Sequence, residues 1–166
     1  MKNAYRNKRL FWHNLKNFDK PNILVYGLDK IVIAGFEFTF CDSSGHPRNI
    51  FIATSSNGDS QMYYEESNKT GMGNIHGNET KIFSNIIDTI LNEISSLTYN
   101  MNRCKHLPPC PKYNFVNFYA LGQNGKFYKT LTYPEIHLIK HPYYPLYIYF
   151  MQLLNEMRKL VIRENI

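Results

Sequence analysis

The chain has 166 residues, of which 43% are apolar and 15% aromatic; this excludes wholesale disorder and suffices for one domain over residues 1–166. The formal net charge is +6, and three cysteines, an odd number, exclude a disulfide framework and favour a reducing compartment. The basic residues 1–9 are not followed by a signal-peptide core, and no apolar run is long enough to span a bilayer. We therefore expect no membrane partner and a protein that is cytoplasmic, or delivered into the cytoplasm of a target cell.

The first half of the chain is predicted to hold one helix and three strands. The helix covers residues 5–18 and ends before Pro21, and the strands cover residues 23–26, 31–40 and 50–54. The alternation of apolar residues changes parity within 31–40, and Gly35 stands where a bulge would produce that change. Residues 55–78 are polar and rich in Gly and Asn, which is typical of a long functional loop.

The second half begins with the most regular helical pattern of the chain, over residues 82–94, with Asn78 as a plausible N-cap. A strand is predicted over 97–101. Strands over 114–121 and 126–133 flank Gly-Gln-Asn-Gly, which is typical of a hairpin. A last helix covers 146–163. This order predicts an α+β fold, with an antiparallel or mixed β-sheet flanked by an N-terminal, a central and a C-terminal helix.

Two motifs next to the central helix suggest metal chemistry. His76 and Glu79 stand at the start of that helix, and Cys104 follows Glu79 after 24 residues, with Cys110 close behind a pair of prolines. In hydrolytic deamination, a zinc ion held by one His and two Cys activates water, while a carboxylate that does not bind the metal moves the proton. We therefore expect zinc as a cofactor, with His76, Cys104 and Cys110 as ligands and Glu79 as the proton shuttle.

At these residues the chain resembles the zinc-dependent deaminase superfamily, in particular the deaminase domains at the C-termini of bacterial polymorphic toxins. The resemblance covers residues 31–112 and implies a hydrolase that deaminates a base in nucleic acid. The chain departs from the family pattern in two places. His76-Gly77-Asn78-Glu79 is one residue longer than His-x-Glu, and Tyr113 stands where the second Cys of Pro-Cys-x-x-Cys belongs, so that Cys104 would supply the missing thiolate.

Basic residues are concentrated near both ends of this region. Residues 1–20 carry six Lys and Arg against one acid, and residues 101–141 also carry six against one, whereas residues 37–94 carry eight acids. This distribution suits a polyanionic partner, because Lys and Arg that contact phosphates release counterions. The residues predicted to hold a nucleic-acid backbone are Arg6, Lys8, Arg9, Arg103, Lys105 and Lys112.

Other interpretations of the same residues stay open. The cysteines can be small buried apolar side chains, and His106 can replace one of them as a ligand. Cys41 and His46 form a candidate nucleophile and base. The chain can also be a non-enzymatic, immunity- or antitoxin-like protein that binds a cognate toxin, or a metal-independent nuclease that uses two of its histidines as acid and base.

Overall fold

One antiparallel sheet forms the centre of the computed structural model, which describes residues 2–15, 23–66, 69–75 and 81–163. Its seven strands lie in the order β4-β3-β2-β1-β6-β7-β5, and every pairing between the described strands is antiparallel. The strands are β1 (Ile31–Cys41), β2 (Pro47–Ser55), β3 (Ser60–Glu66), β4 (Lys69–Ile75), β5 (Asn102–Arg103), β6 (Phe115–Gly122) and β7 (Gly125–Thr132). Of the two sheet types predicted, the antiparallel one is therefore found.

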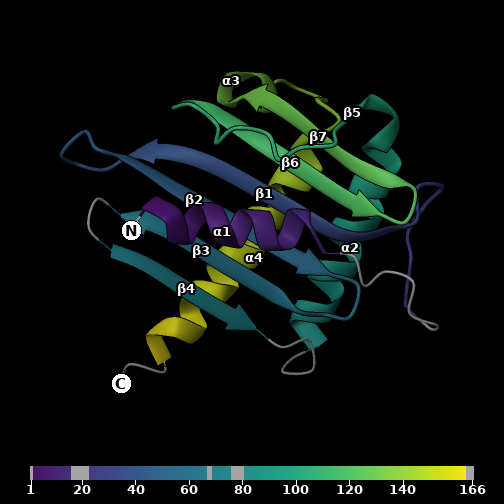
Figure 1. Ribbon diagram of the computed structural model, residues 1–166, viewed down its shortest axis with the longest axis horizontal. Helices are drawn as coiled ribbons and strands as arrows, with labels where there is room; N and C mark the ends of the chain where they lie inside the picture. Colours follow the sequence, from purple (N-terminus) through teal and green to yellow (C-terminus); the bar gives the residue numbers. More distant parts are fainter. Residues whose placement is uncertain (1, 16–22, 67–68, 76–80, 164–166) are drawn as a thin grey trace.

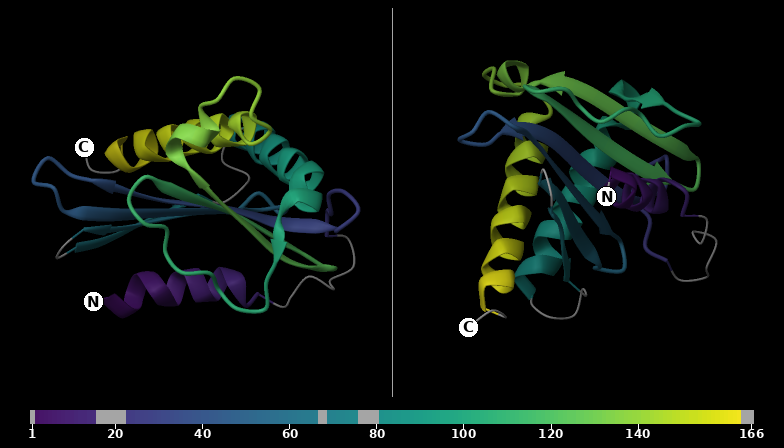
Figure 2. Two further views of the ribbon diagram at one scale, coloured as in Figure 1. Left: turned by 90° about the horizontal axis from the view of Figure 1, so that it is seen from above. Right: turned by 60° about the vertical axis from the view of Figure 1, so that its left-hand side comes forward.

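Helices cover both faces of the sheet (Figure 1, Figure 2). The long helices α2 (Lys81–Leu97) and α4 (Tyr144–Arg163) pack on one face, and α1 (Lys2–His13) lies on the other. Two short helices complete the fold, η2 (Thr98–Asn100) and α3 (Tyr133–Ile136). The predicted α+β fold is thus confirmed. None of the described helices combines the length and the apolar character needed to cross a membrane.

Each face of the sheet has its own apolar core. The larger core lies under α2 and α4 and contains Phe36, Phe118 and Phe150, which are fully buried. The smaller core lies under α1 and contains Tyr5, Trp12, Ile33, Phe51 and Leu121. Because β1 crosses between both cores, its side chains are buried on both faces, which explains its nearly continuous apolar sequence.

The parity change within β1 occurs earlier than predicted. The pairing of β1 with β6 shifts register between Ile31 and Ile33, so that Ile31 belongs to the larger core and Ile33 to the smaller one. Gly35 does not mark this register shift, and its role is in packing. A Cβ at Gly35 would stand 3.3 Å from the side chains of Phe51 and Tyr119, so its missing side chain makes room for two aromatic rings.

Three predicted elements differ from the structure. The predicted loop over 55–78 contains the strands β3 and β4, which form one edge of the sheet. Residues 23–26 contribute only an isolated bridge between Tyr26 and Ile31. The predicted strand over 97–101 is largely the short helix η2, followed by the two-residue β5. Strands that pair mainly through backbone hydrogen bonds carry little apolar pattern for a sequence analysis to detect.

Candidate functional site

Helix α1 is amphipathic in an unusual way, because its inward face carries a charge. Tyr5, Arg9 and Trp12 recur at the spacing of one helical face and are 4%, 4% and 6% exposed. Trp12 donates a hydrogen bond from Nε1 to Gln61 on β3 at 3.2 Å. The guanidinium of Arg9 therefore lies against the sheet, where a charge is costly without a partner.

That partner is Glu37, which stands between Phe36 and Phe38 in β1 and is fully buried. Arg9 Nη2 donates to Glu37 Oε2 at 2.8 Å, and Arg9 Nε lies 2.7 Å from Oε1. The hydroxyl of Tyr5 donates to Oε1 at 2.9 Å, and that of Tyr119 donates to Oε2 at 2.5 Å. The carboxylate thus accepts from α1 and from β6, and it ties the helix to the centre of the sheet.

The protonation of these groups follows from their mutual contacts. Burial raises the pKa of Glu37, while Arg9 and the hydrogen bonds from Tyr119 and Tyr5 oppose that rise. Burial would lower the pKa of Arg9, but the charge of Glu37 outweighs it and the pKa is raised. Burial and the charge of Glu37 hold the pKa of both tyrosines well above 10. The hydroxyls therefore stay protonated, and because every neighbour donates to Glu37, its ionised form is the one that these hydrogen bonds satisfy.

Residues 104–112, which we call the strap, run along α1 on the same side of the sheet (Figure 2). Three side chains from three elements donate to carbonyl oxygens of the strap: Arg9 to Pro108 at 2.9 Å, Asn117 to Pro109 at 3.1 Å and Thr39 to Pro111 at 2.7 Å. Proline has no N–H, so only its carbonyl needs a partner. The sequence Pro108-Pro109-Cys110-Pro111 thus suits an extended segment held from one side.

A groove of about 630 Å³ lies between α1 and the strap. Tyr5, Arg6, Arg9 and Leu10 line it on the helix side, and residues 106–110 line it on the other. Arg6 and His106 are exposed, whereas Tyr5 and Arg9 lie at the buried base. Among the described residues no carboxylate lines the groove, and Glu37 lies beneath Tyr5 and Arg9. The groove therefore combines apolar side chains with the cationic Arg6 and the imidazole of His106 at its opening.

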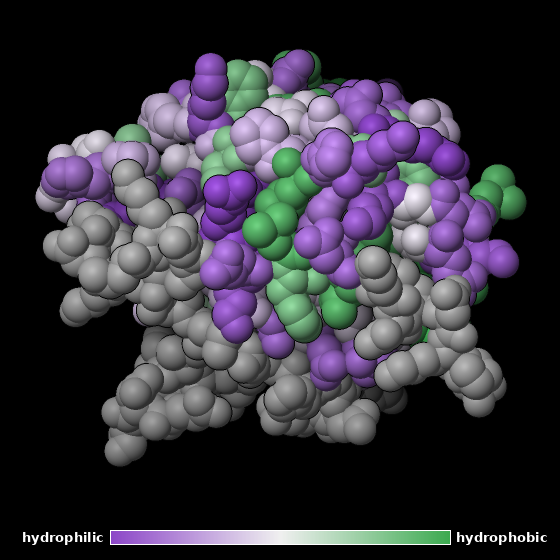
Figure 3. Space-filling view, in the orientation of Figure 1, coloured by the Kyte–Doolittle hydropathy of each residue, from purple (hydrophilic) through white to green (hydrophobic). Residues whose placement is uncertain are grey.

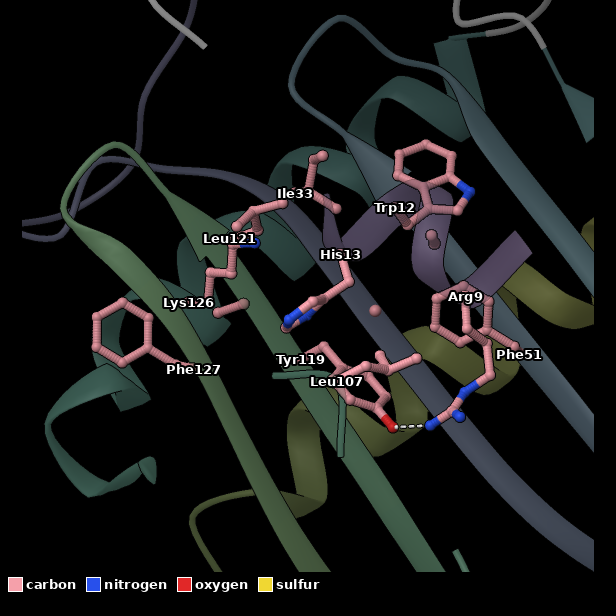
Figure 4. Close-up of a pocket in the computed structure, with 13 residues that line it drawn as sticks. Arg9, Trp12, His13, Ile33, Phe51, Leu107, Tyr119, Leu121, Lys126 and Phe127 are labelled. Atoms are coloured by element: carbon pink, nitrogen blue, oxygen red, sulfur yellow. Dashed lines mark hydrogen bonds between the residues drawn. The ribbon is translucent and has the colours of Figure 1, made fainter. Parts of the chain in front are cut away.

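A second, smaller cavity of about 30 Å³ lies under the other end of α1, where Arg9, Trp12 and His13 project toward Tyr119, Phe51 and Leu121 of the sheet (Figure 4). Its volume corresponds to about one water molecule. His13 Nε2 is buried and has no hydrogen-bond partner among the described residues. Burial and the neighbouring charge of Lys126 lower the pKa of His13, and the nearby Arg9 and His106 add to this effect. A hydrogen bond with the Lys105 backbone opposes the fall in pKa without reversing it, so the surroundings of His13 disfavour its protonation.

The predicted zinc ligands do not come together in the part that the structure describes. His76 and Glu79 lie outside the described residues. Cys110 is exposed beside Tyr5, whereas Cys104 is half-buried at the His13 end, where its N–H bonds to the Lys126 carbonyl at 2.9 Å. Tyr5 and His13 are separated by eight residues of helix, on the order of 12 Å.

Cys110 thus lines the groove and Cys104 does not, and zinc binding by these thiols stays a prediction. Burial also raises the pKa of Cys104, which disfavours the thiolate that a metal requires. Within the described ranges, no group of three or more His, Cys, Asp or Glu side chains is arranged to hold a metal ion.

The predicted phosphate-binding residues fall into three groups. Arg6, Lys8, Lys105 and Lys112 are exposed on α1 and the strap. Arg103 lies at the edge strand β5, with its Nη2 3.5 Å from Asp29 Oδ1, so part of its charge is offset. Arg9 is buried in the pair with Glu37, which corrects the surface role predicted for it.

Lys126 was missed by the sequence analysis and lies beside His13. The sequence analysis also did not single out Glu37, the residue that holds Arg9 in the structure. A single carboxylate at a core position of an apolar strand requires a buried cation, and that is the sequence signal that could have revealed this site.

No model of a known protein family matches this sequence, and comparison with curated proteins finds no match.

Proposed function

We propose that this protein binds nucleic acid through the surface that α1 and the strap form together. The observation that carries the proposal is the meeting of two basic segments that are far apart in the sequence. Helix α1 carries four Lys and Arg and no acid, and residues 102–113 carry three and no acid. These segments lie side by side on one face of the sheet, joined by the hydrogen bond from Arg9 to Pro108.

The charge balance strengthens this argument. When the Arg9–Glu37 pair is set aside, six cations remain in the two segments, and the rest of the chain has twelve Lys and Arg against twelve Asp and Glu. The formal net charge of +6 is therefore located on α1 and residues 102–113. A concentration of one sign of charge on one face attracts a polyanion and orients its approach. Figure 3 views this side of the molecule, and hydrophilic residues surround a small hydrophobic patch there.

The exposed cations lie on both flanks of the helix. Lys8 Nζ is 5.7 Å from the centre of the Tyr63 ring, on the side of β3, while Arg6 lines the groove on the side of the strap. Lys105 and Lys112 stand near the two ends of the strap. If all four contact phosphates of a single strand, the logarithm of the binding constant should fall with the logarithm of salt concentration with a slope of about −3.

The test is fluorescence anisotropy with labelled 20-nucleotide DNA and RNA across a salt series. Arg6→Gln combined with Lys105→Gln should weaken binding and reduce the slope by roughly 1.4, since two phosphate contacts are lost. The matched control removes the same charge elsewhere, with Lys140→Gln and Arg158→Gln, of which Arg158 is on α4 across the sheet. Absence of binding at low salt, or an equal loss in the control, would contradict the proposal.

Deamination of a bound base, which the resemblance implies, stays a prediction, because His76 and Glu79 are outside the described residues. It requires stoichiometric zinc in the purified protein and base conversion that a chelator abolishes. Strand cleavage that survives the chelator would instead favour the metal-independent nuclease. Stable co-purification with one protein, without nucleic-acid binding, would favour the immunity-like role.

A further inference from the structure

The groove between α1 and the strap differs from a flat basic surface in ways that restrict its ligand. Its volume of about 630 Å³ exceeds what a phosphate needs, and its lining places Leu10, Leu107 and two prolines beside the polar side chains of Tyr5, Arg6 and His106. Arg6 and His106, both exposed, face the opening from opposite walls. A slot that offers apolar side chains together with a guanidinium and an imidazole has the chemistry that receives an aromatic ring.

We propose that this groove accepts an unpaired nucleobase, so that the protein binds single-stranded nucleic acid in preference to duplex. The inference rests on the proposed function, because the basic surface must first hold the backbone. In a duplex the bases stay stacked and present only their edges in the grooves, so no base face can enter a groove of the protein. In a single strand, a base can turn outward and stack on side chains, and every base has a face suitable for this.

The rigidity of the strap supports this assignment. Arg9, Asn117 and Thr39 hold three of its carbonyl oxygens, and these donors come from α1, β6 and β1. The groove is thus shaped before a ligand arrives, which reduces the entropy lost on binding. Its prolines have no N–H with which to read base edges. Stacking requires only the face of a base, which every base has, so the groove should accept different bases with little sequence preference.

The experiment compares three 12-nucleotide probes of equal label and salt: a single strand, the same strand with all bases removed, and the duplex. The first two have the same number of phosphates, so their difference measures the contribution of the bases. Single strands should bind roughly tenfold or more tightly than the abasic strand. His106→Ala should remove most of this difference without changing binding of the abasic strand. His46→Ala, which alters an exposed imidazole on the β1–β2 hairpin, is the matched control.

Two failures can be distinguished. Equal binding of all three probes would overturn the base-binding groove and leave the basic surface in place. Binding of none of them would overturn the proposed function and this inference with it. A difference that His46→Ala removes as fully as His106→Ala would also count against the groove.

Discussion

We predict that the ion pair between Arg9 and Glu37 makes a large contribution to the packing of α1 on the sheet. Arg9→Met leaves the charge of Glu37 buried at 0% exposure, and Glu37→Leu leaves that of Arg9 buried at 4%. Breaking a buried pair in this way costs about 3–5 kcal/mol of the free energy of unfolding. For a chain of this length the melting temperature should fall by roughly 6–20 °C.

The double variant should cost much less than the sum of the single ones, because it leaves no unpaired charge. It still leaves the hydroxyls of Tyr5 and Tyr119 without their acceptor and the Pro108 carbonyl without its donor, at about 1–3 kcal/mol each. The double-mutant cycle should therefore report a coupling free energy of about 3 kcal/mol or more.

The fluorescence of Trp12 can distinguish the release of α1 from the sheet from unfolding of the whole protein. Trp12 is the only tryptophan of the chain, and its side chain is buried between α1 and the sheet. In both single variants, the fluorescence transition in guanidinium chloride should precede the far-UV circular dichroism transition. The control is Arg48→Met, which breaks the more exposed pair with Asp42 on the β1–β2 hairpin and should cost below about 1 kcal/mol. Single variants that cost no more than this control, with an additive double variant, would refute the reasoning.

Three further predictions concern other parts of the fold. Gly122→Ala should cost about 3 kcal/mol, because a Cβ there would overlap the carbonyl oxygen of Asp29; urea unfolding measures this, and a cost near zero would contradict it. Burial and nearby cations lower the pKa of His13, so the unfolded chain binds protons that the folded chain resists. The free energy of unfolding should therefore fall as pH drops below about 6.5, and His13→Gln should make that fall smaller; equal slopes from pH 7.5 to 5.5 would exclude this role. Cys110, which is exposed, should react with a thiol reagent faster than the half-buried Cys104, and mass spectrometry of the labelled peptides decides the order.

Where the pattern was strong, the sequence predicted the fold correctly. The apolar face over 82–94 is α2, and Gly-Gln-Asn-Gly joins β6 and β7 as a hairpin. The strands β3 and β4 escaped prediction because their residues are mostly polar or Gly. Strand β3 pairs with β2 from Asn49↔Glu65 to Thr54↔Ser60, and β4 pairs in turn with β3. Such strands are specified by their neighbour rather than by their own periodicity.

The candidate site shows the same limit of local reasoning. The basic character of α1 and of residues 103–112 was visible in the sequence, but their proximity depends on the sheet between them. Arg9 could not be separated from the exposed cations of its helix, because the residue that buries it, Glu37, is 28 positions away. The spacing of Cys104 and Cys110 suggested a shared metal, but it could not show that Cys110 lines the groove while the backbone of Cys104 bonds to Lys126 of β7.

The buried pair also bears on function, because it fixes how α1 is positioned along the strap. Apolar side chains alone tolerate a small slide of a helix on a sheet. Two groups on α1, the Tyr5 hydroxyl and the Arg9 guanidinium, meet one carboxylate of β1, and Arg9 also holds Pro108. These contacts set Arg6 opposite residues 106–110 across the groove.

It follows that stability and groove geometry can be separated. The double variant Arg9→Met/Glu37→Leu removes no exposed cation, so its binding of the abasic strand should match that of the unmodified protein. Its preference for a strand with bases should fall, since Arg6 is no longer held at one position along the strap. The comparison is made below the melting temperature of the variant, with circular dichroism to confirm the fold. If the preference for bases stays intact in a variant without the pair, the register of α1 does not depend on Glu37, and the apolar contacts of Trp12 alone position the helix.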